Sequence, residues 1–577
     1  MSTTDLLDGL DEEQRHAAET LLGPVCVLAG AGTGKTRALT HRIAHGVATG
    51  VYAPERVMAL TFTTRAAGEL RTRLRGLGAG GVAARTFHSA ALAQLSFFWP
   101  QLVGGSLPRV LASKGKLLGQ AAEAIKVKVD TAALRDIAAE VEWRKVSRMS
   151  LDSYARAAAS RPLPPGLDVE TVTALQETYE RIKDERRQID FEDVLLVTAG
   201  MIEAEPRVAE QVRSQYRFFV VDEYQDVSPL QQELLELWLG SRTDLCVVGD
   251  ASQTIYSFAG ATAEFLLGFG SRYDNATVLR LERNYRSAPA VLDTANRLMR
   301  GRPGALELAS ASNLGASARA ATPRDDEPVV TEYESDAGEA RAVAAAVAAE
   351  IASGTRPERI AVLYRVNAQA ATMETAFAEA GISTRQLGGT KFFELDVVKR
   401  AVLELRSAAL ASPRQPLFQS VSDVLRGIGW TLEAPEGGGA VRERWEALTA
   451  LVELADQAAP GTTLTTFAQE LLERQAAQHE PTVSAVVLST LHGAKGLEWE
   501  SVHLVGLSEG LMPISHARGF AAIDEERRLL YVGITRARRR LALSWAREGL
   551  RGQRREPSRF LAELRTGTRD AATKSAR

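Results

Sequence analysis

Residues 25–36 read VCVLAGAGTGKT, an apolar run followed by a glycine-rich turn and then Lys-Thr. The run Val25–Leu28 has the length and composition of a buried strand, and a helical pattern starts near Lys35. Glycines permit the tight turn in which backbone N–H groups surround phosphate oxygens, and the following helix aims its positive end at the same charge. The stretch predicts a parallel α/β sheet with a phosphate-binding loop after a buried strand. The loop comprises Ala29, Gly30, Ala31, Gly32, Thr33, Gly34, Lys35 and Thr36.

Two side chains of this loop have expected roles toward a nucleotide. Lys35 is expected to contact the β- and γ-phosphates of ATP, and Thr36 to supply its hydroxyl to Mg²⁺. Ala29 stands where the usual pattern has its first glycine. The strand before the loop, the helix after it and the Gly-Lys-Thr in register favour a nucleotide site over a plain glycine turn.

A second stretch, residues 219–226, reads FVVDEYQD and supplies the carboxylates that ATP hydrolysis requires. An apolar strand delivers Asp222 and Glu223 to its carboxyl end, the edge at which the functional loops of a parallel sheet gather. Asp222 is expected to hold Mg²⁺, usually through water, and Glu223 to orient and deprotonate the attacking water. An acidic strand end alone is compatible with a solvated turn, but its pairing with the phosphate loop favours the catalytic interpretation.

Composition limits the class of protein further. The chain has 577 residues, 45% of them hydrophobic and 24% charged, which are globular proportions. Its formal net charge of −3 excludes a uniformly basic coat protein but leaves room for a local basic groove. The two cysteines, Cys26 and Cys246, exclude a disulfide framework and any four-cysteine metal site, and both are expected in buried strands. An acidic N-terminal segment and the lack of a run of about 20 apolar residues predict a soluble, cytoplasmic protein without a membrane anchor.

Strand-length apolar runs fall into two sets, which predicts two α/β domains, each interrupted by a mostly helical insertion. In the first insertion, Gly119–Val127 and Ala132–Trp143 are expected to be helical, and residues 90–178 show no convincing strand. From Arg551 onward the chain is basic and expected to be mobile, either as a solvated tail or as a nucleic-acid arm. The first set of strands is Val25–Leu28, Val57–Phe62, Phe218–Val221 and Leu245–Val248. The second set is Val278–Leu281, Ile360–Tyr364, Ala485–Ser489, Val502–Gly506 and Leu541–Ser544.

Short motifs follow one another along nearly the whole chain. Any one of them is weak, but the ordered set resembles superfamily 1A DNA helicases of the UvrD/PcrA/Rep type. The details look most similar to the second UvrD-type helicases of actinobacteria. Besides the two stretches above, the motifs are Leu10–Arg15, Thr61–Ala67, Thr86–Ser89, Asp190–Asp193, Val248–Tyr256, Asn284–Ser287, Leu363–Gln369, Gly388–Glu394, Thr490–Glu498 and Glu525–Ala537.

The resemblance implies two RecA-like motor domains, 1A and 2A, which carry the helical insertions 1B and 2B. Insertion 2B is shorter than in the best-known relatives, and the cysteine-containing linker and C-terminal nucleic-acid-binding domain of the actinobacterial relatives do not follow. Both departures bear on strand separation more than on translocation. The expected bounds are 1–89 and 179–280 for 1A, 90–178 for 1B, 281–387 and 482–562 for 2A, 388–481 for 2B, and 563–577 for a basic mobile tail.

The resemblance also assigns contacts to the nucleotide. Lys35, Arg286 and Arg536 are expected to place positive charge around the γ-phosphate, with both arginines arriving from domain 2A when the cleft closes. Gln253 is expected to sense the γ-phosphate and to couple it to the neighbouring DNA-contact loop. The remaining expected contacts are Gln14 on adenine, Tyr285 stacked on adenine, Arg37 beside the same pocket and Glu498 on the opposite wall.

Single-stranded nucleic acid is held by aromatic stacking and backbone contacts, with about 1–3 kcal/mol for each stacked base. The resemblance implies such a track across both motor domains and 3′→5′ movement along it, while core packing is the alternative for any one aromatic residue. Ala259 replaces a family arginine, and Phe258 stands where many relatives have tryptophan. The expected track consists of Phe62, Thr63, His88, Phe191, Tyr256, Phe258, Arg365, Asn367 and His492.

The leading hypothesis is an ATP- and Mg²⁺-dependent 3′→5′ DNA helicase and single-stranded DNA translocase of repair or recombination. One alternative is a translocase that strips proteins from DNA without efficient unwinding, and another is an ATP-gated DNA-binding scaffold. Intact Lys35, Asp222, Glu223, Arg286 and Arg536 argue against the scaffold. Expected partners are single-stranded DNA, 3′-tailed duplex DNA and repair proteins, with the protein itself a monomer. An RNA substrate stays open, because stacking does not exclude a 2′-hydroxyl.

Overall fold

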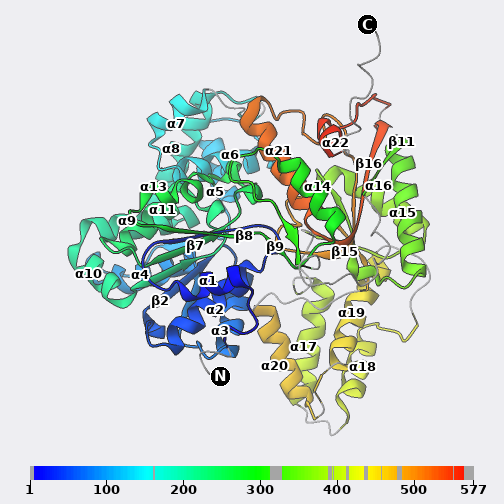
Figure 1. The fold of residues 1–577 in the computed structure, drawn as a ribbon, viewed down its shortest axis with the longest axis horizontal. Coiled ribbons are helices and arrows are strands. Elements are labelled where there is room, and N and C mark those ends of the chain that lie inside the picture. The colour runs from blue at the N-terminus through cyan, green and yellow to red at the C-terminus, as the bar shows by residue number, and fades with distance from the viewer. Residues whose placement is uncertain are drawn as a thin grey trace. The chain divides into compact units, whose positions relative to one another are not determined.

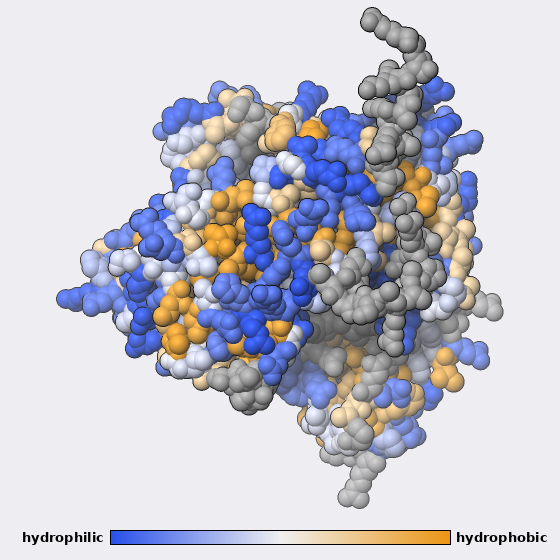
Figure 2. Space-filling view, viewed as in Figure 1, coloured by the Kyte–Doolittle hydropathy of each residue, from blue (hydrophilic) through white to orange (hydrophobic). Residues whose placement is uncertain are grey.

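The computed structural model divides the chain into two compact units, Met1–Glu282 and Arg283–Arg577 (Figure 1). Each unit is built around a parallel sheet, which confirms the expected α/β class. On the face drawn in Figure 2, hydrophobic residues form separate patches among hydrophilic ones. Within the part of the chain that the structure describes, no helix is long and apolar enough to cross a bilayer. The structure describes residues 6–159, 163–164, 166–311, 328–387, 393, 395–410, 415–433, 440–456, 458–459, 461–476, 484–549 and 552–564.

The sheet of the first unit has the strand order β3-β2-β6-β7-β1-β8, and its paired strands run parallel. Its central strands are apolar runs that are buried throughout most of their length, as expected for parallel strands covered on both faces by helices. Both cysteines are buried in these strands, as predicted. The strands are β1 (Val25–Ala29), β2 (Val57–Thr61), β3 (Ala83–Thr86), β6 (Phe218–Val221), β7 (Leu245–Gly249) and β8 (Thr277–Leu281).

Helices cover both faces of this sheet and form a separate apolar core on each. On one face Trp238 stacks against Phe87 and Phe219, with ring centroids 6.0 and 6.2 Å away, and donates its indole N–H to Gln94 at 2.8 Å. The largest side chain of this core therefore keeps its polar atom satisfied. This face is covered by α4 (Phe87–Leu102), α9 (Phe191–Ala204), α10 (Pro206–Gln215) and α11 (Pro229–Leu239). The other is covered by α1 (Glu12–Glu19), α2 (Lys35–Ala48) and α3 (Thr64–Gly76).

Strand β8 corrects the predicted division of strands. The sequence predicts that Val278–Leu281 opens the second sheet, but Thr277–Leu281 pairs in parallel with β1 in the first sheet. The prediction is wrong because an alternating, half-buried run identifies an edge strand without indicating which sheet it joins. The edge strand β3 was missed because its residues, Ala-Ala-Arg-Thr, carry no apolar run.

Residues between α4 and α9 form the helical region of the first unit. The expected helices at Gly119–Val127 and Ala132–Trp143 are confirmed as α5 (Gly115–Ala124) and α6 (Thr131–Val146). The expectation of no strand is wrong at β4 (Arg109–Val110), which pairs in parallel with β5 (Gln188–Ile189). A two-residue ladder is too short for a periodic pattern to reveal. The remaining helices of this region are α7 (Leu151–Ala158) and α8 (Val169–Glu185).

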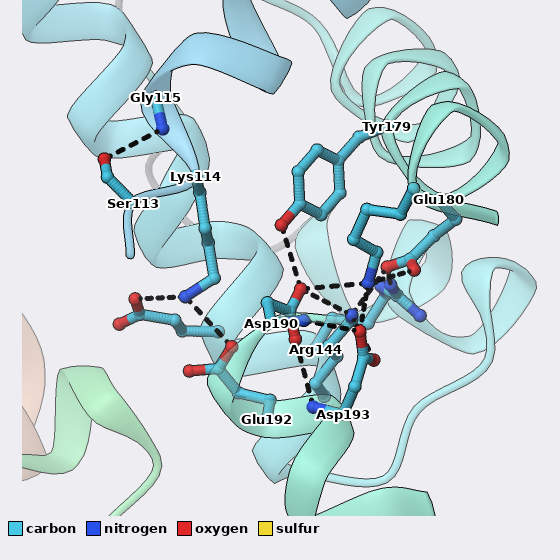
Figure 3. A network of polar contacts seen from close by, with 12 residues as sticks. Ser113, Lys114, Gly115, Arg144, Tyr179, Glu180, Asp190, Glu192 and Asp193 are labelled. Carbon is cyan, nitrogen blue, oxygen red and sulfur yellow. Dashed lines mark hydrogen bonds and ion pairs between the residues drawn. The ribbon is translucent and has the colours of Figure 1, made fainter. Parts of the chain in front are cut away.

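A buried ionic cluster fastens the helical region to the start of α9 (Figure 3). The Nζ atoms of Lys145 in α6 and Lys183 in α8 lie 2.8 and 3.0 Å from Oδ2 of Asp190, and both also contact Asp193. Tyr179 donates its hydroxyl to the same Oδ2 at 2.9 Å. Burial opposes ionisation here, yet the two ammonium groups hold the pKa of Asp190 below its usual range. These charges are stable inside the protein because each is paired and hydrogen-bonded.

The sheet of the second unit has the order β11-β16-β15-β12-β14-β13, again with parallel pairs. The four predicted runs after Val278–Leu281 are confirmed as β12, β14, β15 and β16, with ends shifted by up to several residues. β11 was missed because charged residues alternate along it. The strands are β11 (Val329–Ser335), β12 (Ile360–Tyr364), β13 (Thr384–Gln386), β14 (Val486–Thr490), β15 (Trp499–Leu504) and β16 (Ala537–Glu548).

Two groups of helices accompany this sheet. One group lies between β13 and β14 in the sequence and packs around an apolar core of its own. It consists of α17 (Asp396–Leu410), α18 (Leu417–Gly427), α19 (Ala440–Asp456) and α20 (Leu464–Ala476). The other consists of α14 (Pro289–Met299), α15 (Asp336–Ala352), α16 (Ala370–Glu379) and α21 (Gly519–Ile534). The predicted motif Gly388–Glu394 lies outside the described residues except for Phe393.

The basic C-terminal segment contains a short helix. The sequence predicts a mobile tail from Arg551, but α22 (Arg559–Leu564) buries Phe560 and Leu561, and Arg527 of α21 pairs with Glu563. The expectation is wrong for these residues because Phe560, Leu561 and Leu564 lie at helical spacing and dock the short segment through one buried face. Residues 565–577 lie outside the described part of the chain.

The ionic cluster gives a stability prediction. Lys183→Met should lower the free energy of unfolding by about 3–5 kcal/mol, because it leaves Asp190 and Asp193 buried with one cation fewer. Arg181→Gln is the matched control, since Arg181 pairs with Glu185 on the exposed side of the same helix, where a pair contributes about 1 kcal/mol or less. Urea unfolding followed by circular dichroism measures both; equal midpoints for the two variants would contradict the prediction.

Candidate nucleotide and nucleic-acid sites

The phosphate loop joins β1 to α2 in a turn that depends on glycine. Gly32 and Gly34 have φ values of +70° and +81°, the region that side chains disfavour. Thr33 closes the turn by donating its hydroxyl to the Gly30 carbonyl at 2.9 Å. The buried Gln14 amide donates to the Thr33 carbonyl at 2.9 Å, so Gln14 lies against the loop, beside the predicted adenine position.

Lys35 begins α2, and its buried ammonium group makes the loop suited to an anion. Its side chain is 11% exposed, and Nζ lies 3.8 Å from Oε1 of Glu223. Among the described residues this buried Nζ has no hydrogen-bond partner. Burying an ammonium group without hydrogen bonds is costly, so the site fits an anion whose oxygens accept from it. The triphosphate of a nucleotide in the loop meets that requirement, while Thr36 lies next in the helix and Arg37 donates to the Gly9 carbonyl at 2.7 Å.

Asp222 and Glu223 follow β6 in a tight arrangement. Burial, and next the charge of Glu223, raise the pKa of Asp222 to about 7. Glu223 has a φ of +53°, and its backbone N–H donates to Oδ1 of Asp222 at 2.9 Å. A divalent cation would restore the charged form of Asp222, so the pair fits Mg²⁺. Among the described residues no group of three His, Cys, Asp or Glu side chains that could hold a metal occurs. Mg²⁺ is commonly held by one or two carboxylates together with phosphates and water.

Two residues that the sequence prediction did not single out link these carboxylates to Gln253. Gln225 is fully buried, donates to Oε2 of Glu223 at 2.5 Å, and accepts at its Oε1 from the Asp250 N–H at 3.0 Å. Gln253 donates to Oδ2 of Asp250 at 2.7 Å. Burial raises the pKa of Asp250. Their position within the quoted motifs was a signal, because polar residues that follow two buried neighbouring strands meet at one edge of the sheet.

Four predicted DNA contacts of the first unit lie at the starts of α3, α4 and α9. Phe62 packs partly against the core, 6.3 Å from the Phe87 ring, and Thr63 caps α3 by accepting from the Ala66 N–H at 3.0 Å. His88 meets Phe191 edge to face at 6.0 Å. Burial, and next Lys114, lower the pKa of His88 to about 4, so the ring is neutral at pH 7. The alternative of core packing therefore applies in part to Phe62, whereas Phe191 is 49% exposed.

Tyr256 and Phe258 form a second aromatic pair in the first unit. Their rings meet at 6.0 Å and 72°, in the loop that follows β7 and contains a short 3₁₀ turn, Ser257–Ala259. Phe258 is 56% exposed, whereas Tyr256 is half-buried. The loop ends at Gly260, whose φ is +85°. An exposed phenylalanine held by a neighbouring ring offers a stacking platform.

In the second unit, Arg286 and Glu498 are brought together. They form an ion pair, and Arg538 Nη1 lies 3.6 Å from the other carboxylate oxygen of Glu498. Tyr285, next to Arg286, is 51% exposed. Arg536 behaves differently: it is 2% exposed, with its Nε donating to the Val532 carbonyl at 2.9 Å. The two predicted arginine fingers are thus held by different kinds of partner.

The remaining predicted DNA contacts of the second unit follow β12 and β14. Arg365 makes a bidentate pair with Glu526, at 2.8 to 3.1 Å, and is only 15% exposed. Burial, and next Arg365, lower the pKa of His492 to about 4. Asn367 is exposed at the surface. Asn367 is therefore displayed to solvent, whereas the guanidinium of Arg365 is already engaged by a carboxylate.

Comparison with known proteins follows the same division of the chain. The profile of the UvrD/REP helicase N-terminal domain matches residues 10–274, and that of the UvrD-like helicase C-terminal domain matches residues 279–435 and 439–548. The chain is 46% identical to ATP-dependent DNA helicase UvrD2 of Mycobacterium tuberculosis (strain ATCC 25618 / H37Rv), over 99% of this chain and 83% of that protein.

More distant relatives extend the match. Identity is 28% to the ATP-dependent DNA helicase PcrA of Bacillus subtilis, over 97% of this chain and 86% of that protein. It is 29% to DNA helicase II of Escherichia coli, over 98% of this chain and 88% of that protein. The chain therefore belongs to the UvrD/REP helicase family, which confirms the resemblance drawn from the ordered motifs.

Gly34 provides a test of the nucleotide site. A Cβ at this position would lie 2.6 Å from Nε2 of Gln14, on a backbone with positive φ, so Gly34→Ala should weaken binding of a fluorescent ATP analogue at least roughly 10-fold. Gly50→Ala is the control, because Gly50 has a φ of +75° but open space around it. Fluorescence titration measures both; equal affinities would show that the loop tolerates the displacement of Gln14.

Proposed function

We propose that this UvrD-type helicase couples hydrolysis of ATP–Mg²⁺ to 3′→5′ movement along single-stranded DNA and unwinds 3′-tailed duplexes during repair or recombination. The observation that carries the proposal is the buried, unsatisfied Nζ of Lys35 in a phosphate loop beside Asp222 and Glu223. Membership in the UvrD/REP family supports DNA as the substrate, and the names of the relatives include DNA helicases. The 3′→5′ direction rests on the family resemblance.

The hydrolytic roles follow from the positions of the side chains. Glu223 takes the proton of the water that attacks the γ-phosphorus, while Lys35 neutralises charge on the β- and γ-phosphate oxygens. Asp222 and the Thr36 hydroxyl would hold Mg²⁺, which neutralises further charge on those oxygens. Arg286 and Arg536, from the second unit, supply the remaining positive charge in the transition state.

Coupling between hydrolysis and DNA is supported by the chain of hydrogen bonds from Glu223 through Gln225 and Asp250 to Gln253. The next residues lead directly to the loop with Tyr256 and Phe258. A change in the contacts of Gln253 on loss of the γ-phosphate would therefore be transmitted to Tyr256 and Phe258, three and five residues further along the same segment. The exposed rings of Phe191 and Phe258 support stacking of bases on the first unit.

The direct test compares ATP hydrolysis with and without single-stranded DNA and measures unwinding of duplexes with a 3′ or a 5′ tail. We expect strong stimulation by DNA and unwinding from the 3′ tail only. Lys35→Ala and Glu223→Gln should each reduce the stimulated rate at least about 100-fold while DNA binding persists. Unwinding from the 5′ tail would overturn the polarity, and stimulation without unwinding would favour a translocase. DNA binding without stimulated hydrolysis would favour the scaffold, and equal stimulation by RNA would overturn the DNA preference.

The arginine finger gives a separate prediction. Arg286→Ala should lower the DNA-stimulated kcat about 10³-fold with little change in DNA affinity, because it removes charge that acts on the transition state. Arg538→Ala is the matched control: it removes a second cation from the same Glu498 carboxylate and should change kcat only a few-fold. Steady-state ATPase assays at saturating DNA measure both, and a similar loss in the two variants would contradict the assignment.

A further inference from the structure

The end of α6, residues 144–148, touches several elements of the first unit at once. Arg144 pairs with Glu180 of α8 at 2.6 Å. Lys145 joins the ionic cluster at the start of α9, and Arg148 Nη2 lies 2.7 Å from Oε1 of Glu233 in α11. Between these charged anchors, Val146 faces the loop after β7. One helix end thereby connects three helices and a loop.

The contact with the aromatic loop is direct. A Cβ on Gly260 would lie 2.5 Å from Cγ2 of Val146, so the backbone of the loop rests against this side chain. Such an approach requires glycine, as does the φ of +85° at Gly260. Tyr256 and Phe258 lie on the same short turn, and residue 259 is alanine, so position 259 brings no charged side chain to the loop. Packing on the end of α6 therefore fixes the backbone of the loop that carries these rings.

The end of α6 also contacts the start of α9, which carries the exposed ring of Phe191. Asp190 caps α9 by accepting from the Asp193 N–H at 3.0 Å, and the Asp193 side chain accepts from the Asp190 N–H at 3.0 Å. Phe191 is the next residue, the first of the helix. Because Lys145 binds both carboxylates, a shift of the α6 end would shift the cap and the Phe191 ring with it.

We infer that the end of α6 is a positioning element for DNA: it holds Phe191 and the Tyr256–Phe258 pair in fixed relation to each other. The inference rests on the proposed function for the nature of the ligand, and adds residues that touch no DNA themselves. Loosening this element leaves the nucleotide site unchanged but lets the two stacking platforms move independently. Stacking on two platforms whose spacing varies is weaker, because each base must then order the ring it contacts.

Val146→Ala tests the inference with a matched control. Val129→Ala removes the same two methyl groups from a half-buried valine of the same helical region, one that packs on the α5–α8 core instead of the aromatic loop. In Val146→Ala, the concentration of oligo-dT that gives half-maximal ATPase stimulation should rise roughly 5-fold at unchanged kcat. Amide hydrogen exchange should become faster in residues 256–260 and at the start of α9. Val129→Ala should show neither change and a similar loss in melting temperature.

A second pair of variants guards against misfolding. Arg148→Gln removes the ion pair with Glu233, and Arg181→Gln removes a comparable exposed ion pair on α8. Only Arg148→Gln should reproduce the faster amide exchange and the higher oligo-dT concentration for half-maximal stimulation. Unchanged exchange at residues 256–260 in both Val146→Ala and Arg148→Gln would overturn the inference. If the unsubstituted protein shows no stimulation by DNA, the proposed function fails, while the exchange measurements still decide whether the α6 end positions the rings.

Discussion

The balance of charge around Lys35 is the constraint on which the first unit depends. Three neighbouring strands, β1, β7 and β6, end at one edge of the sheet and bring together an ammonium group and the carboxylates of Asp222, Glu223 and Asp250. Burial, and next the charge of Glu223, raise the pKa of Asp222 to about 7, so the charged form of this carboxylate needs a nearby cation. A phosphate would pair with the Lys35 ammonium, and a divalent cation would pair with the buried carboxylates. The site therefore favours binding phosphate and cation together over binding either one alone.

This arrangement makes the catalytic carboxylate part of a longer polar chain. The Gln225 side chain donates its amide N–H to Glu223 and accepts from the Asp250 backbone N–H at its carbonyl oxygen. It cannot move without breaking one of these two hydrogen bonds. Gln225, Asp250 and Gln253 are buried, and a buried network of this kind is costly to leave partly satisfied, so it tends to shift as a whole. Gln253 and the aromatic loop follow in the same segment, which makes the loop a natural recipient of such a shift.

Much of the first site could be predicted from local sequence, because a phosphate loop and an acidic strand end are each defined by consecutive residues. The limits appear where partners are distant in sequence. Val278–Leu281 reads as a strand, but pairing with β1 instead of the second sheet depends on tertiary contacts. Likewise, the family resemblance predicts Arg365 as a DNA contact, and nothing local reveals that Glu526, 161 residues later, pairs with its guanidinium. The contacts of the α6 end could not be predicted either, because their partners are also distant in sequence.

Arg286 and Arg536, the two predicted arginine fingers, have different partners and are therefore expected to respond differently to a nucleotide. Arg286 is held by the Glu498 carboxylate on a half-exposed surface, and a phosphate can replace that anion with little change in the charge around the guanidinium. Arg536 is almost completely buried and donates to the Val532 and Leu497 carbonyls, which would lose their donors if it moved. Exchange at Arg286 is thus the easier step, whereas Arg536 can reach a phosphate only if the surrounding turn moves with it. Within the second unit, the ion pair of Arg286 with Glu498 is therefore easier to exchange for a phosphate than the buried contacts of Arg536.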